Sequence, residues 1–220
     1  MKKEIKNKIK NCKNIIDMGC GNNPLCEAKT AVDYYIKPIE RSNGDGPVID
    51  EDAFKIRGVR FINARIDSDL PFLNNEFDFA YSHHVFEHLE DPAKACEEMM
   101  RIAQSGVIIA PSFFSELIFG RKYHKWMIMQ RENTLLFFRK RAFEDTPFGD
   151  GPTRKKIGDK WESDSNTNPF DILLNDGNWY TGNEKFDRLS VKIRGLYYSH
   201  HPLIETNFLW ENKFEYKIYE

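Results

Sequence analysis

Cysteine is scarce in this sequence, and the few cysteines are not paired by spacing. Only four occur, and no two of them form a C-x-x-C motif: Cys12, Cys20, Cys26 and Cys96. Such usage argues against a cysteine zinc site or a disulfide framework, and it predicts reduced thiols in a cytoplasmic protein. Long apolar runs are also missing, since stretches such as residues 107–111 are far too short to span a bilayer. The basic N-terminus, MKKEIKNKIKNCK, lacks an apolar core, so we expect no secretory signal.

A strong net charge is likewise absent. The 220 residues carry 32 basic and 34 acidic side chains, and the sequence pI is about 6.3. This balance does not favour nucleic acid as a partner. The charges are nevertheless unevenly distributed, because residues 50–98 hold 12 acidic and 5 basic side chains, whereas residues 120–160 hold 11 basic and 5 acidic ones. The two regions are either faces for different ligands or two ordinary solvated surfaces.

The first half of the chain alternates between β-branched apolar runs and more polar stretches. Strands are predicted at residues 14–18, 30–34, 59–63, 77–82 and 106–111. Ile5 and Ile9 indicate a short amphipathic helix before the first strand. Asp91 and Pro92 are typical of a helix start, and apolar positions between 95 and 103 fall on one helical stripe. Strands alternating with crossovers predict an α/β fold with a mostly parallel sheet covered on both faces.

The pattern changes after residue 112, without a boundary that would divide the chain into independent domains. We therefore expect one domain over residues 1–220, with a cofactor-binding core at 1–112. Residues 113–200 are first aromatic and basic and then rich in Gly, Asn, Asp and Pro, which predicts a substrate-side insertion or lid. Residues 201–220 alternate in polarity on both sides of a short turn, which predicts an antiparallel pair of strands at the sheet edge.

Two glycines follow the first predicted strand in the stretch NIIDMGCGNNPLCEAKTAVDYY, residues 14–35. A dinucleotide site needs G-x-G-x-x-G, so that a helix can hold the pyrophosphate, but Pro24 occupies the third glycine position. The connection to Asp33 also leaves room for only one or two helical turns. A ligand with a ribose and no phosphate fits better, because Asp33 could accept two hydrogen bonds from a ribose diol. Asp17 would lie beneath the loop, where it could orient the loop or meet a ligand ammonium group.

The stretch IIDMGCG, followed by Asp33, resembles the first two motifs of class I S-adenosylmethionine-dependent methyltransferases of the type 11 kind. DSDLPFLNNEFDFAYSHHVFEHLEDP is similar to the region of that family that runs from the adenine-contacting acid through the fourth strand. The resemblance implies a Rossmann-like sheet with S-adenosyl-L-methionine as cofactor. It also implies that Asp67 meets the adenine amino group, while Ser82 and His83 line the cofactor. The full set of predicted cofactor residues is Asp17, Gly19, Cys20, Gly21, Asn22, Asp33, Asp67, Ser82 and His83.

A closer resemblance extends to about residue 141. CGNNPLCEAKTAVDYY, with its abbreviated first crossover, and GVIIAPSFFSELIFGRKYHKW are similar to a bacterial subgroup with Asn-Pro in the glycine loop and a downstream His-x-Trp. Members of that subgroup often accompany surface-glycan synthesis, which implies a glycan precursor or another small molecule as substrate. The family usually has Asp-Ala-Glu before LPF, where this chain has IDSD, so Asp69 is an alternative to Asp67.

His84, Glu87 and His88 are spaced at i, i+3 and i+4 in HHVFEH and would share one face of a helix. The first interpretation is catalytic, because a neutral imidazole near the sulfonium could take a proton from the acceptor. The second interpretation, kept as an alternative, is a metal site. Two imidazoles and a carboxylate are suitable ligands, and the pattern is similar to the E-x-x-E-H sites of ubiquinone-pathway and small-RNA 2′-O-methyltransferases, with His84 replacing the first glutamate. The third is structural, with Glu87 and His88 capping the turn.

The segment RKYHKW follows the fifth predicted strand, where substrate elements are usually inserted. His124 is a further catalytic candidate. Arg121, Lys125 and Trp126 are candidates for contacting the acceptor, since basic side chains pair with phosphate or carboxylate groups. The structural alternative is a solvated helix end with a packing tryptophan.

These observations favour an enzyme that transfers a methyl group to a small or sugar-linked polar acceptor. We expect that acceptor to be anionic and to be methylated on oxygen. RNA methylation is an alternative that the basic and aromatic middle of the chain keeps open, although no RNA-binding module is recognisable. A non-catalytic protein that keeps the methyltransferase fold is a further alternative, followed by a dehydrogenase.

Overall fold

The computed structural model describes residues 3–34, 49–119, 124–140, 155–157, 160–162, 179–180, 199 and 201–220. Within these ranges, none of the helices combines the length and the apolar character that crossing a membrane requires.

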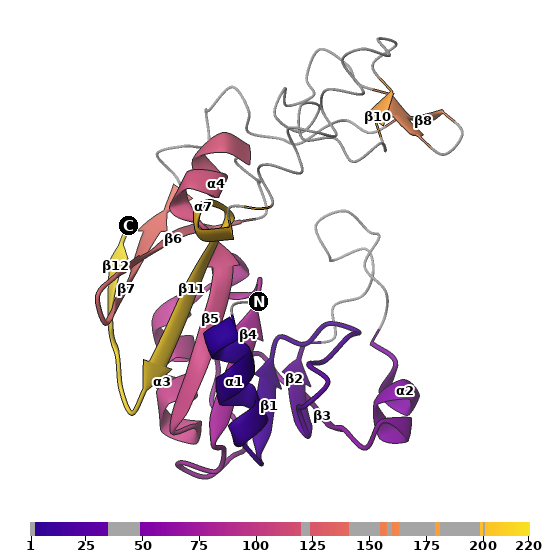
Figure 1. Cartoon of the computed structure of the whole chain (residues 1–220), viewed down its shortest axis with the longest axis vertical. Coiled ribbons are helices and arrows are strands. Elements are labelled where there is room, and N and C mark those ends of the chain that lie inside the picture. The colour runs from indigo at the N-terminus through magenta and orange to yellow at the C-terminus, as the bar shows by residue number, and fades with distance from the viewer. Residues whose placement is uncertain are drawn as a thin grey trace.

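A six-stranded sheet forms the centre of the molecule, in the order β11-β5-β4-β1-β2-β3 (Figure 1). Its strands are β1 (Ile15–Met18), β2 (Thr30–Asp33), β3 (Arg60–Asn63), β4 (Phe79–His83), β5 (Ser105–Pro111) and β11 (Glu205–Glu211). The first five are parallel to one another, and β11 runs antiparallel to β5 along the edge. The predicted α/β fold, with a Rossmann-like, mostly parallel sheet and an antiparallel edge, is confirmed.

Helices cover both faces of this sheet, because successive strand residues point to opposite sides (Figure 1). On one face, Ile5 and Ile9 of α1 (Lys3–Asn11) pack with strand residues that include Ile15 and Phe79. On the other face, the apolar stripe of α3 (Pro92–Ile102) joins a core with the intervening strand residues. Members of that core are Ile16, Met18, Ala80, Ala95, Cys96, Met99 and Ile108. A third cluster, around Phe54 of α2 (Glu51–Ile56), flanks the β2 and β3 side.

The start of α3 follows the prediction. The Asp91 side chain accepts a hydrogen bond of 2.9 Å from the backbone N–H of Lys94, and Pro92 occupies the first turn. Between β4 and α3 the chain forms only a short 3-10 helix, η2 (Phe86–His88). The helix considered for HHVFEH is reduced to this single turn, because His84 has a left-handed backbone with φ of 56°.

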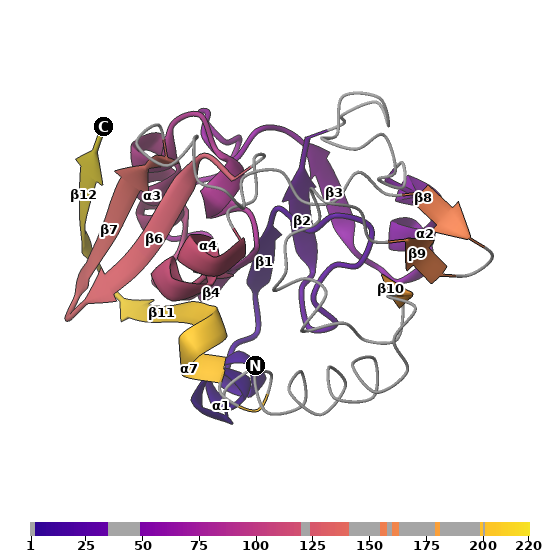
Figure 2. The ribbon, with the colours of Figure 1, turned by 90° about the horizontal axis from the view of Figure 1, so that it is seen from above.

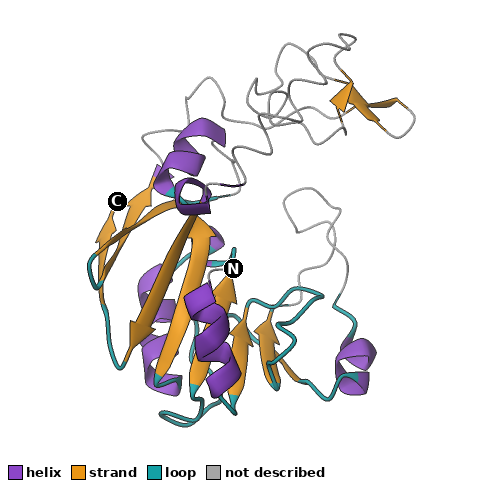
Figure 3. Cartoon of the chain, viewed as in Figure 1, coloured by secondary structure: helices purple, strands orange, loops and turns teal. Residues whose placement is uncertain are grey.

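The connection from β1 to β2 is drawn entirely as loop, without a helix (Figure 3). The sequence left room for at most one or two helical turns in this connection, and no helix forms there. Both ends of the loop are instead bonded to the strands: the N–H of Gly19 donates to the carbonyl of Val32 at 2.7 Å, and that of Lys29 donates to Ile15 at 3.1 Å. The first bond ties the start of the loop to the end of β2, and the second ties the end of the loop to the start of β1.

A second sheet, in the order β12-β7-β6, lies beside α3 at one end of the molecule (Figure 2). It consists of β6 (Trp126–Arg131), β7 (Thr134–Arg139) and β12 (Glu215–Tyr219), with β7 antiparallel to β6 and parallel to β12. Trp126, Ile128, Leu135 and Phe137 belong to the same apolar core as α3. Strands β6 and β7, which lie within the segment predicted as a lid, therefore contribute these side chains to the packed core.

The two C-terminal strands do not pair with each other. β11 takes the predicted place at the sheet edge, whereas β12 joins the second sheet, which corrects the expectation of a C-terminal pair. Asn212 turns the chain with φ of 61°, and its N–H donates to the carbonyl of Gln104 at 2.8 Å. The N–H of Glu215 donates to the carbonyl of Asn133 at 3.0 Å, which starts the pairing with β7.

Two short helices, α4 (Phe113–Phe119) and α7 (His201–Ile204), lie near each other above the carboxyl end of β5 (Figure 1). α4 continues directly from β5, and α7 leads into β11. The strands β8 (Lys155–Ile157), β9 (Lys160–Glu162) and β10 (Trp179–Tyr180) form a small third sheet.

Candidate functional site

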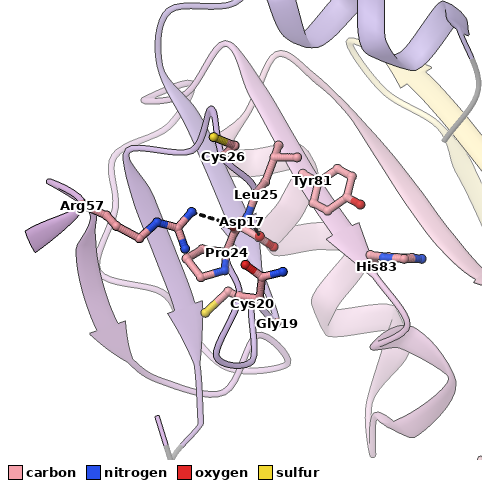
Figure 4. Close-up of a pocket in the computed structure, with 10 residues that line it drawn as sticks. Asp17, Gly19, Cys20, Pro24, Leu25, Cys26, Arg57, Tyr81 and His83 are labelled. Atoms are coloured by element: carbon pink, nitrogen blue, oxygen red, sulfur yellow. Dashed lines mark hydrogen bonds between the residues drawn. The ribbon is translucent and has the colours of Figure 1, made fainter. Parts of the chain in front are cut away.

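The carboxyl ends of β1 and β4 lie side by side where the strand order reverses. The chain leaves β1 toward β2 and leaves β4 toward β5, so the two connections diverge and open a crevice. A cavity of about 420 Å³ lies there, a volume typical of small-molecule sites (Figure 4). Its lining comprises Asp17, Gly19, Cys20, Asn23, Pro24, Leu25, Cys26, Arg57, Tyr81 and His83.

The two loop glycines serve different structural purposes. Gly19 has φ of 88°, and a Cβ atom placed on it would lie 2.2 Å from Cγ2 of Val85, in the turn after β4. Gly21 has φ of 53°, and a Cβ atom placed on it would meet nothing within 4 Å. Its N–H donates a hydrogen bond of 2.6 Å to the carboxylate of Asp33. The loop therefore lies against the turn after β4 on one side and is bonded to the end of β2 on the other.

Asp17 lies beneath this loop, as predicted, and its carboxyl group is almost fully buried. It accepts a hydrogen bond of 2.7 Å from the N–H of Leu25. Burial raises the pKa of Asp17 to about 7, with a further increase from the charge of Asp33, although the Leu25 hydrogen bond acts in the opposite direction. The group therefore titrates near neutral pH, and a cationic ligand beside it would favour its ionised form.

The predicted cofactor residues divide into three groups in the structure. Asp17, Gly19, Cys20 and His83 line the cavity. Gly21, Asn22 and Asp33 belong to the same loop or to the strand end that it contacts, but they are not among the lining residues. Ser82 and Asp67 are occupied by other parts of the fold.

Ser82 joins two strands and does not line the cavity. Its side chain is fully buried, and its hydroxyl donates a hydrogen bond of 2.8 Å to the carbonyl of Met18, which connects β4 to β1. The predicted contact with the cofactor is corrected to this structural contact, because side chains at alternate positions of β4 face opposite sides of the sheet. Tyr81 and His83 face the cavity, and Ser82 between them faces away.

Asp67 likewise holds two segments of the chain together. Both of its carboxylate oxygens accept hydrogen bonds from Arg65, at 2.9 and 2.7 Å, and one also accepts from the backbone N–H groups of Glu90 and Asp91 at 3.2 and 3.3 Å. Although burial opposes the shift, these bonds hold the pKa of Asp67 below its ordinary value. The alternative, Asp69, is 92% exposed and pairs with Lys94 at 2.6 Å. Neither carboxylate lines the cavity.

Tyr81 and Arg57 line the cavity, and the sequence analysis identified neither. Figure 4 places Tyr81 and His83 on one side and Arg57 on the opposite side, with the loop residues between them. Tyr81 could have been found, since it lies two positions before His83 and so faces the same way on β4. Arg57, whose Nη2 donates to the carbonyl of Pro24 at 2.9 Å, reaches the loop from the end of α2, and no motif marks it.

Glu205 binds the two adjacent histidines at the end of β4. Its Oε1 lies 3.7 Å from Nε2 of His83 and 3.5 Å from Nε2 of His84. Hydrogen bonds to these rings hold the pKa of Glu205 well below its ordinary value. Although burial lowers it, hydrogen bonds to Glu205 and Glu87 raise the pKa of His84 to about 9. His84 thus carries its proton at neutral pH, which does not match the predicted role as proton acceptor.

Glu87 lies between two of the predicted catalytic histidines. Its Oε1 is 3.2 Å from Nδ1 of His84 and 3.8 Å from Nε2 of His88. The grouping of these three side chains was predicted, but a left-handed His84 and a 3-10 turn produce it rather than a helix face. His124 packs edge-on against His88, with ring centroids 4.8 Å apart. None of these residues is among the described side chains that line the cavity.

The predicted acceptor residues are engaged elsewhere or lie outside the described residues. Arg121 is in the latter group. Lys125 forms a close ion pair with Glu90, and Lys125 holds the pKa of this exposed carboxylate below its ordinary value. Trp126 is 2% exposed and donates its indole N–H to the carbonyl of Leu89 at 2.8 Å. Trp126 therefore packs in the core, and the predicted contact with the acceptor is corrected.

Residues 16–110 match the family model described as "Methyltransferase domain". That range contains the glycine loop, Asp33 and the end of β4. The segment that carries these features is therefore similar to a methyltransferase domain, which agrees with the resemblance seen in its motifs.

The individual curated relatives share little sequence identity with this chain. An uncharacterized methyltransferase of Schizosaccharomyces pombe is 24% identical over 136 residues, covering 56% of this chain and 49% of the relative. Ajmaline N-methyltransferase of Rauvolfia serpentina is 29% identical over 104 residues, covering 44% of this chain and 34% of the relative. The chain thus spans half or less of the length of these curated relatives. A crystal structure from Thermotoga maritima, described as a SAM-dependent methyltransferase and possible histamine N-methyltransferase, shares 21% identity with a TM-score of 0.35, covering 50% of this chain and 52% of that one.

Proposed function

We propose that this protein transfers a methyl group from S-adenosyl-L-methionine to a hydroxyl group of a small polar acceptor. The observation that carries the proposal is the cavity at the carboxyl ends of β1 and β4, which is lined by the buried Asp17 and by the glycine loop. Its position within the segment that matches a methyltransferase domain supports the same conclusion.

The loop residues suit a nucleoside with a positively charged tail. Asp17, whose pKa is raised to about 7 by burial, would be stabilised in its ionised form by a cationic group at the cavity. Asp33 already orients its carboxylate toward the loop through the N–H of Gly21, and a carboxylate can accept both hydrogen bonds of a ribose diol. The cofactor supplies an electrophilic methyl group on a sulfonium sulfur.

His83 is the proposed proton acceptor, because it lines the cavity and its ring contacts Glu205. The glycine loop, Asp17 and Asp33 would hold the cofactor, which would give its methyl group to the acceptor oxygen and keep the electron pair of the carbon–sulfur bond on sulfur. The hydroxyl proton passes to the imidazole of His83, and the carboxylate of Glu205 stabilises the resulting imidazolium. Glu205 acts in this scheme as a positioning residue.

The acceptor is proposed to be small, anionic and linked to a sugar. The cavity volume and the balanced net charge support a small molecule over RNA. The anionic character rests on the basic residues between 120 and 160, and the link to a sugar rests on the sequence resemblance. Because Lys125 is paired with Glu90, it is a weaker candidate for the acceptor's charge than the sequence suggested.

Binding and turnover can be measured separately. Thermal shift with S-adenosylhomocysteine is expected to raise the melting temperature, whereas NAD is expected to leave it unchanged. Radiolabelled methyl transfer to a panel of sugar phosphates, sugar acids and RNA then identifies the acceptor class. Stabilisation by NAD alone would contradict the cofactor assignment, and labelling of RNA alone would contradict the acceptor assignment.

The role of His83 requires a readout that separates chemistry from binding. We expect His83→Ala to lower kcat by about 100-fold or more while the affinity for S-adenosylhomocysteine changes little. Glu205→Gln is expected to lower kcat less, with little change in the affinity for S-adenosylhomocysteine, because the imidazolium formed in the reaction loses its carboxylate partner. An unchanged kcat in His83→Ala would assign the proton to another acceptor.

A further inference from the structure

We propose that Glu87, His88 and His124 bind a divalent first-row transition-metal ion such as Zn²⁺. One possible donor atom from each of these side chains lies within 4.8 Å of the other two. Two imidazole nitrogens and one carboxylate oxygen form a ligand set that Zn²⁺ and related ions accept, whereas Mg²⁺ and Ca²⁺ prefer oxygen ligands alone. This site is separate from the cavity proposed for the cofactor.

Backbone bonds between η2 and the start of β6 bring the three side chains together. The N–H of Lys125 donates to the carbonyl of Glu87 at 2.6 Å, and the indole N–H of Trp126 donates to the carbonyl of Leu89 at 2.8 Å. These two bonds place His124, the residue before Lys125, against the end of η2. The backbone position of His124 is therefore set by contacts within the fold.

The carboxylate of Glu87 points independently to a ligand. Glu87 is 1% exposed, and its Oε2 atom is buried without a hydrogen-bond partner among the described residues. A carboxylate oxygen that is buried away from water without a hydrogen-bond partner costs free energy, so native structures rarely contain one. A metal ion held with the two imidazoles would satisfy this oxygen.

His124 already has the partner that metal-binding histidines usually have. Its Nδ1 forms a close hydrogen bond with Oε1 of Glu116, and Oε2 of Glu116 pairs with Nζ of Lys140 at 3.0 Å. All three side chains are buried. A carboxylate on one ring nitrogen fixes the ring and its tautomer so that the other nitrogen, here Nε2, faces the metal. Three protein ligands would leave a coordination position for water or an acceptor oxygen.

A second group, His83, His84 and Glu205, has a similar spacing but a different character. Its donor atoms also lie within 4.8 Å of one another. Both imidazoles are 42% exposed, and the carboxylate of Glu205 contacts both rings. Among the described side chains, this group contributes no buried oxygen that lacks a hydrogen-bond partner, so it serves as the comparison for the proposed site.

Metal binding can be tested without cofactor or turnover, so its failure is distinguishable from failure of the proposed function. The full-length protein, freed of metal by dialysis against EDTA, is titrated with Zn²⁺ by calorimetry and with Co²⁺ by visible absorption. We expect one ion to bind per chain and to raise the melting temperature. The visible absorption of bound Co²⁺ should be that of a four- or five-coordinate ion. His88→Ala and His124→Ala are expected to abolish binding. Glu116→Gln is expected to weaken it by roughly 10- to 100-fold.

Glu205→Gln is the matched control, because it disrupts the second group and leaves the proposed ligands in place. We expect it to bind Zn²⁺ like the unaltered protein. His88→Ala is the mildest of the ligand substitutions for folding, since the His88 side chain is 40% exposed, and circular dichroism verifies that each variant is folded. The proposal is overturned if the unaltered protein binds neither ion, or if Glu205→Gln loses binding that folded His88→Ala and His124→Ala variants retain.

Discussion

Gly19 lies directly against Val85, which joins the loop after β1 to the turn after β4. A Cβ atom on Gly19 would be 2.2 Å from Cγ2 and 2.7 Å from Cγ1 of Val85, far inside van der Waals contact. The glycine motif of this chain therefore has a packing reason in addition to any contact with a ligand. The same contact sets the distance between the two strand ends that border the cavity.

We expect Gly19→Ala to destabilise the protein by roughly 2–5 kcal/mol, from the left-handed backbone and the overlap with Val85 together. Gly21→Ala is the matched control, because its φ of 53° is also left-handed but its Cβ would meet nothing within 4 Å. The Gly21→Ala substitution should lower the free energy of unfolding by only about 1–2 kcal/mol. Denaturant unfolding measures both values, and Val85→Ala should recover part of the loss in Gly19→Ala. Equal losses in the two glycine variants would contradict the packing argument.

Asp33 provides a second test, at the level of the cofactor. We expect Asp33→Asn to weaken binding of S-adenosylhomocysteine by roughly 10- to 100-fold, since hydrogen bonds to a charged group contribute about 1.5–3 kcal/mol. Calorimetric titration measures this change. Asp69→Asn removes an exposed carboxylate that the sequence offered as an adenine contact, and its affinity should stay unchanged. A loss in Asp69→Asn with none in Asp33→Asn would reverse the two assignments.

Local patterns in the sequence predicted the five parallel strands and the helices α1 and α3. The five parallel strands were found because each is a short apolar run, and α3 was found because Asp91 caps it and Pro92 occupies its first turn. Burial of Ile5 and Ile9 also follows from their spacing alone. Such features depend on neighbours within a few residues, so they can be inferred from the chain without its fold.

Contacts between distant segments could not be predicted in the same way. Glu205 is the first residue of β11, which runs antiparallel to β5. It therefore lies where the parallel strands end, beside the carboxyl end of β4. Its position in the sequence contains no sign of this. Likewise, Asp67 was assigned to the cofactor from its place in a motif, but Arg65, only two residues away, binds its carboxylate. The choice between a ligand and a protein partner depends on side-chain geometry.

Trp126 tests one of these corrections. We expect Trp126→Phe to lower the free energy of unfolding by roughly 1–3 kcal/mol, because the buried carbonyl of Leu89 loses its donor. The KM for the acceptor should stay the same, since the ring is 2% exposed. Met129→Leu, on the partly exposed outer part of the same strand, should change neither quantity. A raised KM in Trp126→Phe with unaltered stability would restore the contact with the acceptor that the sequence suggested.

The pKa of Asp17 predicts a pH dependence of stability. Burial raises this pKa from 3.8 to about 7 in the folded protein, so the folded state binds more protons than the unfolded state between these values. The raised pKa stabilises the folded state by about 4 kcal/mol relative to high pH. This stabilisation is fully present below about pH 4 and is lost as the pH rises through 7. Asp17→Asn removes the titration while keeping an oxygen for the N–H of Leu25. Urea unfolding between about pH 4 and pH 8 should therefore give a flatter profile for the variant, which becomes the more stable protein at the alkaline end. Parallel profiles for the two proteins would place the carboxyl group in a more polar environment than the structure shows.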